Sequence, residues 1–118
     1  MIKYEQFEKE AFHSTLDKNL RKKLITTEQY DLFTKQHDSS AIKFTDNGVG
    51  FFFDYNDINS CNQKKIILSG GDYTSKSHPE IMVEIILFVI NDTISCMEGH
   101  GYGDYIDPVF FEDYIVNR

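Results

Sequence analysis

The chain lacks several features that would place it at once in a class of proteins. It has no tryptophan and only two cysteines, Cys61 and Cys96, among 118 residues, so no disulfide framework is indicated. The longest apolar run is the six residues 85–90, far short of the roughly 20 that a membrane-spanning helix needs. The charged N-terminus has no apolar signal-peptide core. These absences predict a cytoplasmic protein with reduced thiols and no membrane association.

Basic residues are nearly absent from the last third of the chain. Residues 1–76 contain eleven acidic and eleven basic residues, whereas residues 77–118 contain eight acidic residues and a single base, Arg118. The whole net charge of −7 therefore comes from the C-terminal segment. This bias is opposite to that of a nucleic-acid-binding protein, so no nucleic-acid partner is expected. It favours a basic protein partner, and acidity kept for solubility alone fits equally well.

Ten phenylalanines and seven tyrosines, in a chain with 41% hydrophobic residues, indicate a globular protein that can bury one core. We therefore expect a single α+β domain over residues 1–118, with N-terminal helices packed on a mainly antiparallel sheet. Residues 2–13 have apolar side chains at helical spacing, and Ser14–Asp17 resembles a capping box that starts a second helix over residues 15–25. The pattern leaves open whether residues 15–36 form one bent helix or two.

Strand signals begin at residue 41. Residues 41–45 and 49–55 are rich in apolar and aromatic residues and flank a turn at Asp46–Gly48. Residues 64–68 predict another strand, which we expect Ser69–Gly71 to stop.

β-branched residues dominate the next stretch and favour strands over one long helix. We expect a C-terminal hairpin with strands at 82–90 and 93–102, and Asn91-Asp92 as its two-residue turn. The unbroken apolar run at 85–90 predicts a central strand covered on both faces.

Three glycines alternate near the end of this hairpin, at positions 99, 101 and 103. If the strand continues, the glycines share one face, while His100, Tyr102 and Asp104 share the other. The glycine face would accept either one of the chain's own aromatic rings or a binding partner.

Residues with catalytic or metal-binding chemistry form no recognisable motif. Glu98 and His100 lie two apart and could begin a zinc site with Asp104 or His78, but no Cys-x-x-Cys or His-x-x-x-His accompanies them. Cys61 lacks the local signature of a catalytic nucleophile. We therefore expect a protein that is not an enzyme, with no catalytic residue, metal or cofactor. A small metal-dependent hydrolase around Glu98 and His100 is the alternative.

The segment 104–114 mixes aromatic and acidic side chains and contains no base. Asp107-Pro108 predicts the start of a short helix, with Val109, Phe110 and Tyr114 packed on the sheet. The acids and tyrosines then form a surface suited to a cationic protein, or the aromatics are core and the acids are solvated. The candidate partner-binding residues are Glu98, His100, Tyr102, Asp104, Tyr105, Asp107, Glu112 and Asp113.

Two stretches resemble a group of small bacterial proteins. Residues 44–55, FTDNGVGFFFDY, are similar to the group's TGVGFF strand, which follows N-terminal helices. Residues 86–103, ILFVINDTISCMEGHGYG, are similar to its hairpin followed by Leu-Glu-Gly-Tyr-Thr-Tyr. Here Met97 replaces the leucine, His100 interrupts the motif, and Asn91-Asp92 replaces a frequent Asp-Gly turn.

That group resembles the small immunity proteins of bacterial toxin–immunity pairs, including contact-dependent growth-inhibition systems. The resemblance implies an α+β domain that binds a cognate toxin domain, and it implies no catalytic residues. Many such toxins are nucleases with cationic clefts, so an acidic partner can mimic the phosphates that it excludes. We therefore expect a cytoplasmic, monomeric immunity protein that neutralises a basic toxin through its acidic face. A dimeric structural or scaffold protein, with the glycine strip as self-contact, is a second alternative.

Overall fold

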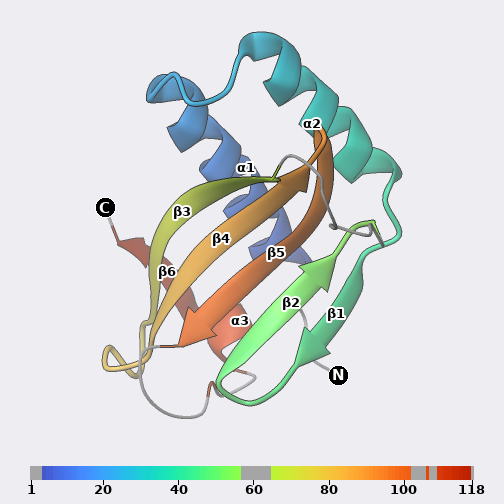
Figure 1. Cartoon of the computed structure of the whole chain (residues 1–118). Coiled ribbons are helices and arrows are strands. Elements are labelled where there is room, and N and C mark those ends of the chain that lie inside the picture. Colours follow the sequence, from blue (N-terminus) through green and yellow to red (C-terminus); the bar gives the residue numbers. More distant parts are fainter. Residues whose placement is uncertain (1–3, 57–64, 102–105, 107–108, 118) are drawn as a thin grey trace.

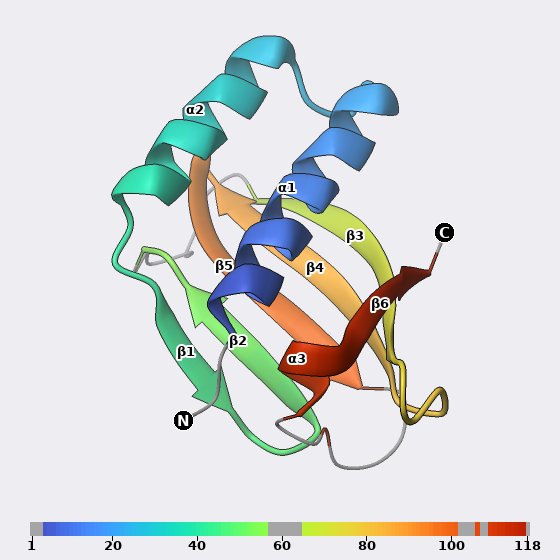
Figure 2. The same cartoon turned by 180° about the vertical axis from the view of Figure 1, so that it is seen from behind.

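The computed structural model describes residues 4–56, 65–101, 106 and 109–117. In chain order the elements are α1 (Glu5–Arg21), α2 (Thr27–Ser39), β1 (Lys43–Asp46), β2 (Gly50–Asp54), β3 (Lys65–Ser75), β4 (Met82–Ile90), β5 (Thr93–Gly101), α3 (Phe110–Asp113) and β6 (Tyr114–Asn117). The strands form one sheet in the order β1-β2-β5-β4-β3-β6, and all neighbouring pairs are antiparallel. The helices lie on one face of this sheet (Figure 1 and Figure 2). The predicted α+β fold class is confirmed.

The predicted C-terminal hairpin is also confirmed, as strands β4 and β5. Both residues of its turn have positive φ, 50° for Asn91 and 57° for Asp92. A two-residue turn with these angles matches the right-handed twist of the two strands that it joins. The side chain of Gln36 fixes the turn to α2, because it donates to the Asp92 carbonyl at 2.9 Å and accepts from the Ile94 amide at 2.8 Å. The local sequence and a tertiary contact with α2 therefore both favour the turn at Asn91-Asp92.

The helix start predicted at Ser14–Asp17 is wrong, because α1 runs through these residues without a break. The Thr15 hydroxyl donates to the Ala11 carbonyl at 2.7 Å, one turn back in the same helix, so it caps no new helix. The chain leaves the helical path only after Arg21, and Lys23 has a φ of 60°.

Helix α2 begins at a capping box around Thr26. The Thr26 hydroxyl accepts a hydrogen bond from the Gln29 amide at 3.1 Å, and the Gln29 side chain accepts one from the Thr26 amide at 2.9 Å. Residues 15–36 therefore belong to two separate helices, with the break at residues 22–26.

The strand predicted to stop at Ser69–Gly71 continues to Ser75 as β3. A bulge lies between Ser69 and Gly71, where Gly71 takes a φ of 97°. Lys18 of α1 donates to the Gly70 carbonyl at 2.9 Å and so uses the backbone exposed by the bulge. The glycines therefore bend the strand under α1 and do not end it.

Strand β6 was not predicted, and it pairs with the far end of β3. Asp107 and Pro108, the predicted helix start, lie outside the described residues. Helix α3 follows, and Phe110 and Phe111 are buried. The chain becomes extended at Tyr114.

The core lies between the helices and the sheet, with the ring of Phe7 near its centre. This ring makes edge contacts with the aromatic rings of Phe51, Tyr73, Phe110, Phe111 and Tyr114. Edge-to-face packing of this kind is favourable beyond the burial of apolar area. Aromatic side chains therefore make up much of the core between the helices and one face of the sheet.

The glycines of β5 are explained by neighbours within the chain. A Cβ atom at Gly99 would collide with the ring of Phe51, and one at Gly101 would approach the Val49 carbonyl and the Ile106 side chain. Of the two possibilities for the glycine strip, the chain's own aromatic ring is the observed one at position 99. Gly103 lies outside the described residues.

A buried polar cluster joins both helices to the sheet. The Glu8 carboxylate accepts a hydrogen bond from the Tyr55 hydroxyl at 2.6 Å, and the same oxygen lies 2.7 Å from His37 Nε2. All three side chains are buried, and the ring of Phe12 stacks on the His37 ring with centroids 4.2 Å apart. The cluster thereby satisfies a buried carboxylate and fixes α1 and α2 on one face.

The prediction that strand 85–90 is covered on both faces is wrong. Ile85, Leu87 and Val89 are fully buried beneath the helices, whereas Ile86 and Phe88 are partly exposed on the other face. Ile90, which has the same phase as Ile86 and Phe88, is 4% exposed. Both long helices pack on the same side, so the apolar residues of the second face have no described helix above them (Figure 1).

Candidate functional site

Strand β5 brings together two of the predicted binding residues, Glu98 and His100. Both point away from the helices, because alternate residues of a strand face opposite sides and Gly99 between them faces the core. His100 Nε2 lies 2.6 Å from Glu98 Oε1, and the two side chains are 54% and 17% exposed. The two residues therefore form an ion pair when the histidine is protonated, on the face that the helices leave uncovered.

Glu112 and Asp113 lie in α3, on the helix side of the sheet (Figure 2). The Asp113 carboxylate accepts hydrogen bonds from the hydroxyl groups of Ser77 and Ser75, and these bonds hold its pKa below the usual value. Asp113 thus ties α3 to the turn after β3. The other predicted residues, Tyr102, Asp104, Tyr105 and Asp107, lie outside the described residues. The four that are described are divided between the two sides of the sheet.

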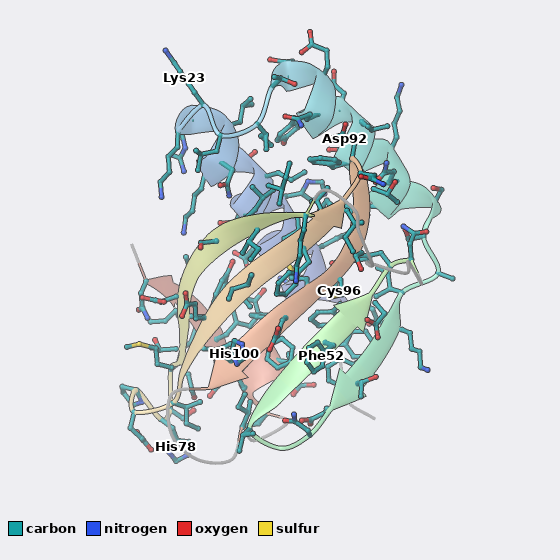
Figure 3. The ribbon with its side chains drawn as sticks, in the orientation of Figure 1. Lys23, Phe52, His78, Asp92, Cys96 and His100 are labelled. Carbon is teal, nitrogen blue, oxygen red and sulfur yellow. The ribbon has the colours of Figure 1, made fainter. Side chains whose placement is uncertain are left out.

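The face opposite the helices, called the open face below, carries rows of side chains that cross the sheet, and three of them cross its middle. The first row is Asp54, Cys96, Phe88 and Ile67. The second row is Phe52, Glu98, Ile86 and Ser69. The third row is His100, Glu84 and Asp72. The register fixes these rows, because directly paired residues of an antiparallel sheet point to the same side. Figure 3 shows this face, with Phe52, Cys96 and His100 labelled.

Apolar side chains lie in the first two rows of the open face. Ile67 is 57% exposed and pairs with Phe88 on the neighbouring strand. Phe52, Ile86 and Phe88 are partly exposed, although all three come from strands in the interior of the sheet. This patch was not predicted, because the unbroken apolar run at residues 85–90 indicated a strand covered on both faces. A signal for the patch is nevertheless present in the sequence, because the neighbouring strands have apolar residues at successive positions and so place some of them on each face of the sheet.

Acidic groups lie around and between these apolar side chains. The carboxylates of the open face belong to Asp54, Asp72, Glu84 and Glu98. The described basic residues on this face are Lys43, which pairs across from Asp54, and Lys65. Lys65 Nζ lies 4.7 Å from the centre of the Phe88 ring, so the patch already holds one cation on an aromatic face. The open face therefore combines apolar surface with an excess of carboxylates.

The thiol of Cys96 lies in the first row of the open face, next to Asp54 and Phe88. Burial and the nearby carboxylates of Asp54 and Glu98 raise the pKa of this thiol to about 11. A thiol with this pKa is protonated at neutral pH and is a poor nucleophile. Cys96 therefore contributes packing surface to the open face.

The geometry around His100 does not assemble a metal site from the described residues. His100 is paired with Glu98, and His78 lies 3.3 Å from Glu80 at the turn between β3 and β4, apart from His100 (Figure 3). Within residues 4–56, 65–101, 106 and 109–117, no three His, Cys, Asp or Glu side chains are grouped so that they could hold a metal ion. Asp104, the third ligand considered from the sequence, lies outside these ranges.

A shallow groove on the other side of the molecule runs between α1 and β6. Its lining carries charges of both signs, with Lys9, Lys18 and Arg21 beside Glu10 and Asp17. This mixture of charges favours neither an anionic nor a cationic ligand. The open face, with its apolar side chains and excess of carboxylates, favours a cationic one.

Within the described part of the chain, no helix is long and apolar enough to cross a membrane. No protein-family model, curated protein or solved structure matches the chain.

Proposed function

We propose that this chain is a cytoplasmic immunity protein that binds and neutralises a cognate bacterial toxin domain without catalysis of its own. The observation that carries the proposal is the open face, where apolar and carboxylate side chains share one side of the sheet and no described element covers them. The sequence resemblance to immunity proteins supports the same class.

Burial of the apolar part of the open face would contribute favourable free energy to association with the partner. Burying a side chain such as Phe or Ile completely yields about 1.5–3 kcal/mol relative to full exposure, and the partly exposed residues of this face would gain a share of that. Phe52, Ile86, Phe88 and Ile67 form this part. Such a patch on a monomer is typical of a protein-binding surface.

The carboxylates supply selectivity for a basic partner. A net charge of −7 and an acidic open face speed the encounter with a cationic protein and orient it on approach. A toxin that acts on nucleic acid has a cationic cleft, and carboxylates at its mouth would exclude the phosphates of the substrate. The proposed mechanism is thus occlusion by a complementary surface.

The test is co-expression of the chain with the C-terminal domain of the protein that the adjacent upstream gene encodes, where we expect the toxin. We expect the cells to survive and the two proteins to purify as a one-to-one complex. Cells killed at equal expression, with no complex on gel filtration, would contradict the proposal. A catalytically inactive toxin domain serves as the control for toxicity unrelated to binding.

A further inference from the structure

The geometry points to a specific occupant of the open face: a cationic amphipathic helix of the toxin domain, with apolar residues on one side and Lys or Arg beside them. We infer this from the residues of the face, and the inference rests on the proposed function for the identity of the partner.

The open face has no described helix packed on it. A sheet with apolar residues on both faces is stabilised when each face packs against another element. Here α1 and α2 both cover one face, and Ile86 and Phe88 of the central strand β4 remain partly exposed on the other. An amphipathic helix has an apolar stripe, which can pack along these side chains and those of Phe52 and Ile67.

Carboxylates stand beside the apolar side chains of the open face. Glu98 stands in the row between Phe52 and Ile86, and Glu84 and Asp72 lie side by side in the next row. A cationic residue beside an apolar contact of the docked helix would therefore lie near one of these carboxylates, of which Glu98 is also paired with His100. A guanidinium group can bind a carboxylate through two parallel hydrogen bonds, which favours arginine at these positions.

The Lys65 side chain contacts Phe88 on the open face. Its ammonium group lies over the aromatic ring, and its aliphatic stem leads there from the neighbouring strand β3. The chain itself thus shows how a long cationic side chain packs on this patch. A helix carrying Lys or Arg beside leucine or isoleucine repeats this arrangement across the open face.

A second copy of the chain fits the face less well. It would bring the same carboxylates against those of the first copy, and each copy carries a net charge of −7. Like charges placed opposite each other across an interface oppose association. The charge pattern therefore selects a basic partner.

The experiment compares two exposed residues on opposite sides of the molecule. Ile67, on the open face, is 57% exposed, and Leu24, after α1 on the helix side, is 62% exposed. Arginine at either position is solvated, so we expect Ile67→Arg and Leu24→Arg both to fold, and circular dichroism checks this. Calorimetry then measures their affinity for the toxin domain and for a Leu/Lys helical peptide of about 18 residues.

We expect Ile67→Arg to weaken binding of both ligands by about tenfold or more, because it adds a like charge and removes apolar contact area. Leu24→Arg should bind as the wild type does, and a peptide of the same composition in scrambled order should bind more weakly than the helical peptide. Equal effects of the two substitutions, or no effect of either, would overturn the inference.

The outcomes separate this inference from the proposed function. If Ile67→Arg still neutralises the toxin and binds it with wild-type affinity, the immunity function stands and the open-face inference is wrong. If the wild type neither binds nor neutralises the toxin domain, the toxin assignment falls, and the peptide series alone decides the chemistry of the face. Concentration-dependent dimerisation that Ile67→Arg abolishes would assign the face to a second copy and overturn the inference.

Discussion

At the scale of single residues, the buried cluster of Glu8, His37 and Tyr55 explains why both long helices stay on one side of the sheet. Glu8 lies in α1, His37 in α2 and Tyr55 directly after β2, and the three side chains satisfy one another away from water. A carboxylate buried without such partners would be strongly destabilising. Specificity for the one-sided arrangement thus depends partly on polar contacts.

Tyr55→Phe tests this cluster, because it removes one hydrogen-bond donor from a buried carboxylate. We expect it to lower the free energy of unfolding by about 1.5–3 kcal/mol, as for other hydrogen bonds to charged groups. The matched control is Tyr30→Phe, which removes a tyrosine–carboxylate bond to Asp17 of 2.9 Å at an exposed site and should cost only a few tenths of a kcal/mol, about the value of exposed pairs. Urea unfolding of both variants is the measurement, and equal losses would argue against the role of the buried cluster.

The same tyrosine makes stability depend on alkaline pH. Burial, and then the charge of Glu8, raise the pKa of Tyr55 well above its ordinary value of 10.0. The folded state therefore holds this proton more tightly than the unfolded state, so its contribution is complete below pH 10 and is lost as the pH rises further. The free energy of unfolding should fall above pH 10, and less steeply in Tyr55→Phe. Parallel declines in the two proteins would be inconsistent with this assignment.

Cys96 gives a residue-level test of the environment on the open face. With a pKa of about 11, its thiolate fraction at pH 8 is smaller by a factor of about 100 or more than that of an ordinary cysteine. In a Cys61→Ser background, we expect iodoacetamide to alkylate Cys96 slowly at pH 8, faster towards pH 11, and rapidly after unfolding. Rapid alkylation of the folded protein at pH 8 would show that the thiol is less shielded than the structure indicates.

At the scale of elements, local signals in the sequence predicted the hairpin but not the extent of α1. Asn91-Asp92 specifies a turn through backbone conformations that few residues adopt readily, so a short sequence was sufficient. Ser14–Asp17 has the composition of a capping box, yet the side chain of Thr15 bonds back into the same helix. Tertiary packing of the α1 face on β3 and β4 decided between these possibilities, and residue composition alone does not contain that information.

The start of α2 offers a matched pair of substitutions at adjacent threonines. Thr26 makes both bonds of the capping box, whereas Thr27 is the first residue of the helix. Thr26→Ala should lower the free energy of unfolding by about 1 kcal/mol, and Thr27→Ala should change it little. Thermal unfolding distinguishes them. A larger loss of stability in Thr27→Ala would indicate that Thr27 is the N-cap and that the helix begins one residue later.

At the scale of the whole molecule, the central feature is the difference between the two faces of the sheet. The fold class and the hairpin followed from periodicity, but the coverage of each face depends on how many helices the chain forms and where they pack. One long α1 replaces the two short helices expected over residues 2–25, and it lies beside α2 on the same face. The open face is therefore a property of the assembled chain, which the apolar run at 85–90 and the apolar residues in both phases of the neighbouring strands only indicate in the sequence.

The most direct test of the account is an NMR measurement on the complex with the toxin domain, using protein labelled at the isoleucine methyl groups. Ile85 and Ile86 are neighbours in β4, with Ile85 buried beneath the helices and Ile86 on the open face beside the row of Ile67. We predict that binding shifts the methyl signals of Ile86 and Ile67 strongly and those of Ile85 and Ile94 weakly. Shifts confined to Ile25, between the helices, with Ile67 and Ile86 unchanged, would contradict the claim that the open face binds the partner.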